Sequence, residues 1–143
     1  PYTDYYPKVR QFIRNKWQQR WHQCHLNRPN KLYSIQSEIG EFQIFGLTRK
    51  EEAVIHRIRI GHTRLTHAYL MEQRGPIKIP PTCQFCNNPN EMLTVCHVMI
   101  DCPHFRYIRQ RFYISPDMKY LFENVSLTNI IGFLRSAGLF KHI

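Results

Sequence analysis

The stretch that decides the fold is Cys83-Gln-Phe-Cys86-Asn-Asn-Pro-Asn-Glu-Met-Leu-Thr-Val-Cys-His97-Val-Met-Ile-Asp-Cys102. It has a Cys-x-x-Cys pair and, after a ten-residue loop, a His-x-x-x-x-Cys pair. Thiolate sulfur and imidazole nitrogen are ligands that zinc prefers, and four of them complete a tetrahedral structural site. The spacing therefore predicts that Cys83, Cys86, His97 and Cys102 bind one zinc ion in a closed site.

Three other residues are weaker candidates for this metal site. Cys96 adjoins His97, and because neighbouring side chains point in different directions we expect it to be a buried thiol; replacement of His97 by Cys96 stays open. His104 is a lesser alternative, and Cys24 is remote in sequence. Four protein ligands leave no position for a reactive water, and the carboxylates form no paired set, so we expect no intrinsic enzyme activity.

The length and cysteine usage indicate one zinc-stapled domain or two small subdomains. The chain has 143 residues, 43% of them hydrophobic, and four of its five cysteines lie between Cys83 and Cys102. That clustering favours metal ligation in a reducing compartment over disulfides, so we expect an intracellular protein of the nucleus or cytoplasm. The chain begins at Pro1 without a methionine, which is what we expect of a piece of something longer.

The charge of the chain favours a polyanionic partner. The formal net charge is +10 and the isoelectric point is about 9.7. Such a balance suits nucleic acid or an anionic membrane surface. We expect no membrane partner, because no apolar run approaches the roughly 20 residues of a spanning helix.

Residues 1–30 are predicted to form a basic helix and linker. Apolar residues recur at helical spacing: Val9, Phe12, Ile13, Trp17 and Trp21. We expect the tryptophans to pack in a core. The basic residues among them, which include Lys16 and Arg20, form a positive field because no carboxylate occurs from Tyr5 to Ser37. Residues 31–47 follow neither the helical nor the strand period and are predicted to be a connector.

Residues 31–143 are predicted to form a helical zinc-binding, nucleic-acid-binding domain. Thr48 and Glu51 make a capping-box pattern, so a helix should begin at about residue 49. Gly61 should interrupt it and Thr63 should cap a second helix, giving a helical pair over residues 48–73. The residues around the glycine could bind phosphate, or the arginines could simply be solvated. This candidate group contains Arg57, Arg59, His62, Thr63 and Arg64. Four further residues are also predicted to contact nucleic acid: Lys16, Arg20, Arg106 and Arg109.

The rest of the domain consists of the metal segment and C-terminal helices. Residues 75–81 should be extended because of their prolines, and residues 81–103 should carry the zinc site. A basic helix should begin near Pro103, with Arg106, Arg109 and Arg111 on its surface. Further helices are predicted after Ser115-Pro116-Asp117 and after Ser126 or Thr128, within residues 104–143. The fold class is therefore mainly α, a small multi-helix domain stapled by a CCHC zinc site, with irregular linkers.

A family resemblance rests on two blocks of this sequence. The first block is Arg57-Ile-Arg-Ile-Gly-His-Thr-Arg-Leu-Thr-His67, and the second combines Cys83-x-x-Cys86 with His97 and Cys102-Pro103. They resemble the C-terminal region of non-LTR retrotransposon polyproteins of the I and Jockey type, which follows the reverse transcriptase and ribonuclease H domains. Trp17-Gln18, Trp21 and Asn30-Lys31-Leu32 are similar to the linker after ribonuclease H.

The resemblance implies a CCHC domain that holds template RNA or target DNA during target-primed reverse transcription. It also implies contact with the reverse transcriptase and ribonuclease H portions of the same polyprotein. Tyr69, Phe85 or Tyr107 could stack on unpaired bases. Because these residues contain no polymerase, ribonuclease H or endonuclease motif, any such activity would belong to the parent protein. The alternative is a docking module for the polymerase or a host protein, in which zinc serves only folding.

Overall fold

The computed structural model describes residues 5–72, 76–86 and 88–143, and the chain divides into two compact units, Pro1–Gln43 and Ile44–Ile143. The first unit extends beyond the predicted boundary at residue 30. The reason is a set of hydrogen bonds between the first helix and the segment at residues 36–39. Trp21 Nε1 donates to the carbonyl oxygen of Gln36 (3.2 Å), and Gln18 Nε2 donates to that of Ser37 (2.9 Å).

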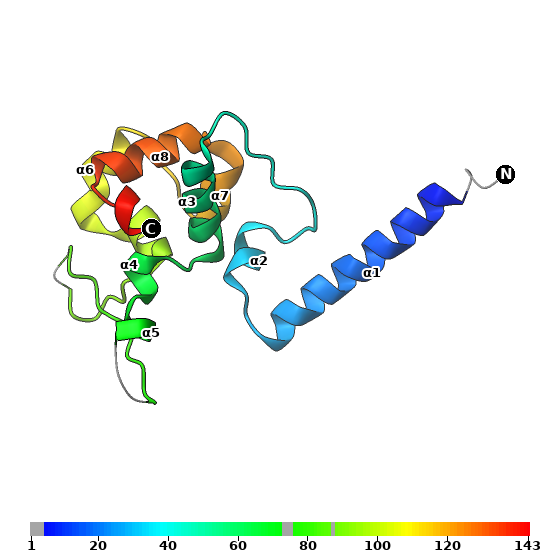
Figure 1. The fold of residues 1–143 in the computed structure, drawn as a ribbon, viewed down its shortest axis with the longest axis horizontal. Helices are drawn as coiled ribbons and strands as arrows, with labels where there is room; N and C mark the ends of the chain where they lie inside the picture. The colour runs from blue at the N-terminus through cyan, green and yellow to red at the C-terminus, as the bar shows by residue number, and fades with distance from the viewer. Residues whose placement is uncertain (1–4, 73–75, 87) are drawn as a thin grey trace. The chain divides into compact units, whose positions relative to one another are not determined.

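The first unit contains two helices, α1 (Tyr6–Asn27) and α2 (Lys31–Ile35), shown in Figure 1. Pro7 lies in the first turn of α1, where its missing amide hydrogen costs no helical hydrogen bond. The sequence did not predict α2, which falls in the expected connector. Its start is fixed by Asn30, whose side chain accepts a hydrogen bond from the amide of Leu32 (2.9 Å).

The prediction that the α1 tryptophans pack in a core is wrong for Trp17. No residue of α1 is buried, and Trp17 is 64% exposed. Trp21 is partly buried, and its ring lies 5.8 Å from that of Tyr33. The α1 helix is therefore held by polar contacts and by Trp21, while most of its apolar side chains face solvent.

The second unit begins with α3 (Arg49–Ile60), followed by the short helices α4 (Arg64–His67) and α5 (Tyr69–Glu72). The predicted capping box of Thr48 and Glu51 is confirmed, with the Thr48 amide donating to Glu51 Oε2 (2.8 Å). Gly61, at φ 68°, ends α3, because an L side chain rarely adopts that conformation. Thr63 then caps α4 as predicted. Gln73 and Gly75, which the predictions included, lie outside the described residues.

The C-terminal part of this unit consists of short helices: η3 (Pro103–Phe105), α6 (Arg106–Gln110), α7 (Met118–Asn124), α8 (Leu127–Ser136) and η4 (Phe140–His142). Asp117 caps α7 and Ser126 caps α8, which confirms two predicted starts. Gly138, at φ 72°, follows the end of α8. The described residues contain no strand, only an antiparallel bridge between Thr82 and Met92, so the mainly α prediction is confirmed.

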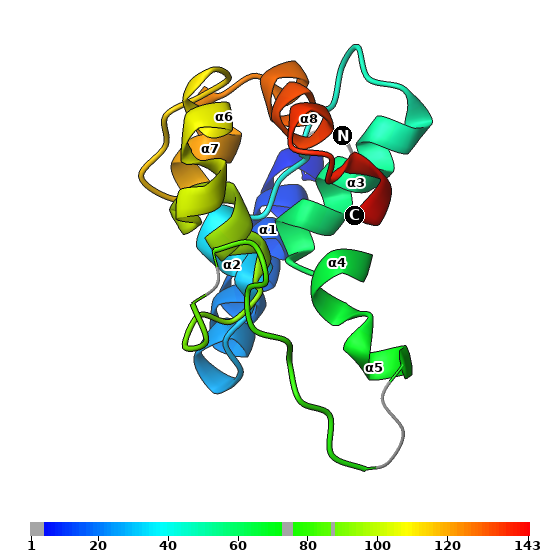
Figure 2. The same cartoon turned by 90° about the vertical axis from the view of Figure 1, so that its left-hand side faces the viewer.

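The core of the second unit lies where α3, α6 and α8 meet, while α4 and α5 project from that cluster (Figures 1 and 2). The ring of Phe133 packs edge-on against those of Phe105 and Tyr113, with centroids 6.1 and 5.4 Å apart. Burying one such side chain stabilises a fold by about 1.5–3 kcal/mol. Cys102 and Phe105 are both buried and three residues apart, so the core adjoins the predicted metal segment. None of the described helices has the length and apolar character needed to cross a membrane.

Candidate metal centre

The four residues predicted to bind zinc are brought together in the structure. The ligand atoms of Cys83, Cys86, His97 and Cys102 all lie within 4.8 Å of one another. Two of the separations are 3.9 Å, between the sulfurs of Cys83 and Cys102, and 3.5 Å, between Cys86 Sγ and His97 Nε2. The group can therefore hold one metal ion.

These separations fit a tetrahedral ion. Bonds of about 2.3 Å to sulfur and about 2.0–2.1 Å to nitrogen, at tetrahedral angles, place neighbouring ligand atoms about 3.5–3.8 Å apart. The sulfurs of Cys83 and Cys102 are also too far apart for a disulfide, whose bond is about 2.05 Å. Three thiols and one imidazole are soft ligands that suit zinc, so the cluster is consistent with zinc.

The Cys83–Cys86 pair is positioned by the β-bridge that precedes it. The Cys83 amide donates to the carbonyl oxygen of Glu91 (2.7 Å), and the Leu93 amide donates to that of Pro81 (2.9 Å). The bridge returns the chain from Cys86 to the start of the His97 segment. Asn87, part of the predicted turn, lies outside the described residues. The bridge thereby fixes two ligands next to the segment that supplies the other two.

His97 and Cys102 occupy the two ends of a single wide turn, the π-helix η2 (His97–Asp101). The Cys102 amide donates to the His97 carbonyl oxygen at 2.6 Å. In a regular α-helix, residues five apart project about 140° from each other, so they could not bind one ion. The wider turn brings both side chains to the same side. π-helical turns are rare, and those that occur are frequently at functional sites. No sequence pattern predicted this one.

The cluster is largely closed to solvent. Cys102 is fully buried, His97 is 5% exposed, and only Cys86 is partly exposed. Burial raises the pKa of the Cys102 thiol to about 11, whereas the backbone amide of Asn88 lowers the pKa of Cys86. Cys102 therefore stays protonated at neutral pH without metal. A bound dication stabilises the thiolate, so binding would release a proton.

Glu91 lies beside the histidine ligand. Its Oε2 is 3.5 Å from His97 Nδ1, longer than a usual hydrogen bond, so it acts through charge. The opposite ring nitrogen, Nε2, faces Cys86. A carboxylate behind a metal-binding histidine fixes the ring's orientation and raises its basicity. Sequence reasoning did not identify this residue, although a glutamate within the ligand loop was a usable signal.

The residues named as alternative ligands do not join the cluster. Cys96 is exposed, so the prediction of a buried thiol is wrong, and its sulfur lies 3.9 Å from Asp101 Oδ2. Cys24 belongs to the first unit. The ring of His104 packs against Phe105, with centroids 4.9 Å apart.

The predicted phosphate-binding residues fall into two groups. Arg59, 6% exposed, and Thr63, the buried cap of α4, do not lie on the surface. Arg57 is exposed but donates to the carbonyl oxygen of Ile143 (2.7 Å), and the half-buried Arg109 donates to that of Val98 (3.3 Å), so both guanidinium groups have structural contacts. The remaining candidates are also exposed: Lys16 and Arg20 on α1, His62, Arg64 and Arg106. The ring of His62 stacks on that of His67, with centroids 3.8 Å apart.

Comparison with known proteins adds no family to these observations. No family model matches the chain, and the searches of curated proteins and of solved structures found no match. What can be concluded about function therefore comes from the site and the surface.

Proposed function

We propose that residues 44–143 form a zinc-stabilised module that binds nucleic acid. In this proposal the module is the C-terminal domain of a non-LTR retrotransposon polyprotein and holds template RNA or target DNA during target-primed reverse transcription. The observation that carries the proposal is the convergence of three thiols and one imidazole to within 4.8 Å of one another in a net-basic chain. Structural zinc sites of this composition stabilise small domains whose cores are too small to do so alone.

Zinc would act here by fixing the elements that carry exposed cations. The ligand Cys102 is followed directly by η3 and α6, so the position of Arg106 depends on the metal segment. Arg64 begins α4 and is exposed as well. Guanidinium groups pair with phosphate oxygens through parallel N–H donors, which favours arginine for such contacts. Binding that neutralises four to six phosphates would give a slope of log affinity on log salt of about −3 to −5.

The test is fluorescence anisotropy of the full chain with single-stranded RNA, single-stranded DNA and duplex, over a range of salt. The double variant Arg64→Gln/Arg106→Gln should reduce the duplex slope by about 1.8, because two phosphate contacts are lost. The matched control, Lys119→Gln/Lys141→Gln, removes the same charge from other exposed positions. It should leave most of the slope intact.

Chelation supplies the second arm of this test. Removal of zinc should lower both the helicity and the affinity, because the metal stabilises the cation-bearing helices. Equal affinity and slope for the arginine variant, its control and the unmodified chain would refute nucleic-acid binding by this surface. That result would favour the alternative, a docking module for the polymerase or a host protein.

A further inference from the structure

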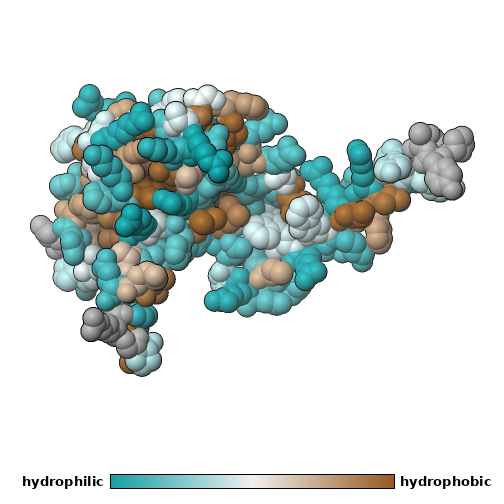
Figure 3. Space-filling view, in the orientation of Figure 1, coloured by the Kyte–Doolittle hydropathy of each residue, from teal (hydrophilic) through white to brown (hydrophobic). Residues whose placement is uncertain are grey.

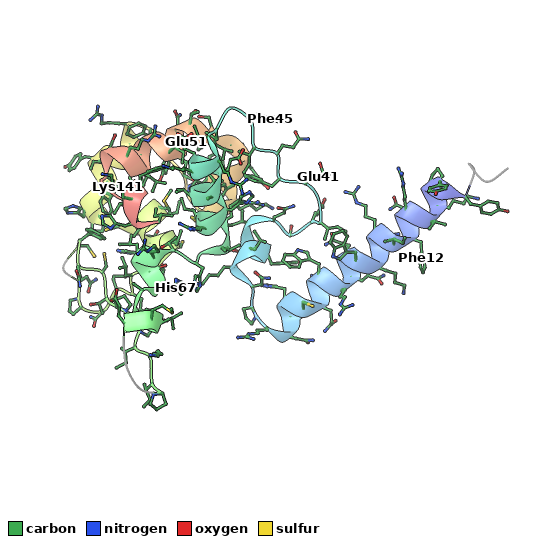
Figure 4. The ribbon with its side chains drawn as sticks, in the orientation of Figure 1. Phe12, Glu41, Phe45, Glu51, His67 and Lys141 are labelled. Carbon is green, nitrogen blue, oxygen red and sulfur yellow. The ribbon has the colours of Figure 1, made fainter. Side chains whose placement is uncertain are left out.

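The first unit presents an apolar and basic surface that the metal centre does not explain. The α1 stripe comprises Val9, Phe12, Ile13, Lys16, Trp17 and Arg20. All six side chains are exposed, Phe12 by 63% and Trp17 by 64%. Hydrophobic and hydrophilic residues adjoin along α1 in Figure 3, and Phe12 projects away from the helix in Figure 4.

The stripe lies on one side of the helix. At 3.6 residues per turn its six side chains project within an arc of about 140°. Within that arc the cations lie between the apolar groups, in the order Phe12, Lys16, Val9, Arg20, Ile13 and Trp17. The Nζ atom of Lys16 lies 5.8 Å from the centroid of the Phe12 ring. The positively charged groups and the aromatic rings therefore lie on the same face of the helix.

A different side of α1 carries the contacts within the unit. Gln18 Oε1 accepts a hydrogen bond from the Ile39 amide (2.8 Å), and Trp21 Nε1 donates one to the Gln36 carbonyl oxygen. Neutral polar residues lie opposite the stripe, among them Gln11, Asn15 and His22. The connector therefore makes its hydrogen bonds to another side of the helix. Ile39, Gly40 and Glu41 border a pocket that Ile13 and Trp17 also line, and both of these stripe side chains stay more than half exposed, Ile13 by 56% and Trp17 by 64%.

This pattern does not suit a lipid bilayer or an apolar protein groove. Helices that lie in a membrane surface separate their apolar face from their charged face. Here Lys16 and Arg20 lie inside the apolar arc, so insertion would draw two cations away from water. An apolar groove would likewise have to bury both charges without partners, which is costly.

We propose that the α1 stripe binds a single strand of nucleic acid, independently of the metal centre. Lys16 and Arg20 pair with phosphates, and Phe12 and Trp17 stack on unpaired bases, the combination that single-strand-binding surfaces use. In a duplex the bases are paired and stacked inside the helix, so Phe12 and Trp17 could not stack on them. From Phe12 to Arg20 the helix rises about 12 Å, which accommodates about three stacked nucleotides.

The test compares two variants of the full chain with a matched control, by anisotropy with short labelled single-stranded RNA, single-stranded DNA and duplex, with and without a chelator. Phe12→Ala/Trp17→Ala should weaken single-strand binding about thirtyfold or more, with or without metal, because two stacking contacts of at least about 1 kcal/mol each are lost. Lys16→Gln/Arg20→Gln should reduce the single-strand salt slope by about 1.4. The control Lys8→Gln/Lys119→Gln removes the same charge outside the stripe and should preserve the slope. Because α1 buries no residue and alanine favours helix, circular dichroism should show intact helices.

Three results would overturn this proposal. One is unchanged single-strand affinity in Phe12→Ala/Trp17→Ala. Another is binding of duplex as tightly as single strands in the chelated chain. The third is stripe-dependent binding to anionic lipid vesicles while binding to oligonucleotides is unaffected. Failure here would leave the proposed function of the second unit testable, since that function predicts zinc-dependent binding sensitive to Arg64 and Arg106 and insensitive to Phe12 and Trp17.

Discussion

Substitution of Cys102 by serine should destabilise the second unit more than the same substitution at Cys96, which lies outside the cluster. Cys102 is fully buried, its sulfur lies 3.9 Å from that of Cys83, and its amide closes the turn that positions His97. The variant loses one metal ligand and places a hydroxyl in the core. Both effects lower the stability of the second unit, so their sum is an upper estimate of the change.

The size of the effect follows from linkage. At free zinc about a thousandfold above the dissociation constant, binding contributes about 4 kcal/mol to the free energy of unfolding. A buried hydroxyl without a partner costs a further ~1–3 kcal/mol. The sum, about 5–7 kcal/mol, matches the whole stability of many small domains. For a unit of residues 44–143 the metal contribution alone corresponds to a drop in melting temperature of roughly 15–30 °C.

The assay is thermal unfolding by circular dichroism, with zinc and with a chelator. The unmodified chain should lose helicity or melt far lower after chelation, and Cys102→Ser should melt in zinc at or below the temperature of the chelated unmodified chain. Cys96→Ser is the matched control, because its exposed sulfur lies outside the cluster and faces Asp101. The reasoning fails if Cys102→Ser and Cys96→Ser melt alike in zinc, or if chelation leaves the unmodified chain unaffected.

Three further predictions concern the packing of the second unit. Gly132→Ala should cost about 1–3 kcal/mol in urea unfolding, because its Cβ would lie 2.6 Å from Cε1 of Phe112; unchanged stability would contradict this close approach. Tyr113→Phe should cost about 1 kcal/mol by the same measurement, because the buried hydroxyl donates to a carbonyl oxygen in the π-turn at 3.0 Å. Glu51→Gln should destabilise the unit at neutral pH, since the amide and hydroxyl of Thr48 lower the pKa of the carboxyl. That contribution is present above pH 4.5 and is lost as the pH falls through the lowered pKa. The free energies of unfolding of Glu51→Gln and of the unmodified chain should therefore differ at neutral pH and converge in acid. A difference that does not change with pH would contradict this role of the carboxylate.

The metal ligands could be predicted from the sequence because their chemistry and spacing are local. One turn is enough to place two thiols that are separated by two residues on the same metal ion. The following loop then has only to bring His97 and Cys102 back beside them. The helix starts were predictable for the same reason: the side chains of Thr48 and Asp117 bond to amides within three residues. Signals of this kind do not depend on the rest of the fold.

The features that were missed depend on tertiary contacts. The π-turn brings the His97 and Cys102 side chains to the same side, which no local propensity encodes. Trp17 looked like a core residue because its helical period is apolar, but its side chain is 64% exposed and no residue of α1 is buried. Arg59 looked like a surface cation and is buried, because its position on α3 faces inward beside Ile58. Charge and period alone could not separate these cases.

Metal analysis combined with X-ray absorption spectroscopy of the purified chain tests the account most directly. It should find one zinc ion per chain, bound by three sulfurs at about 2.3 Å and one nitrogen at about 2.0 Å. The nitrogen signal should disappear in His97→Ala. Absence of stoichiometric metal, or a shell of oxygen ligands in place of sulfur, would contradict the central claim that Cys83, Cys86, His97 and Cys102 hold a structural ion.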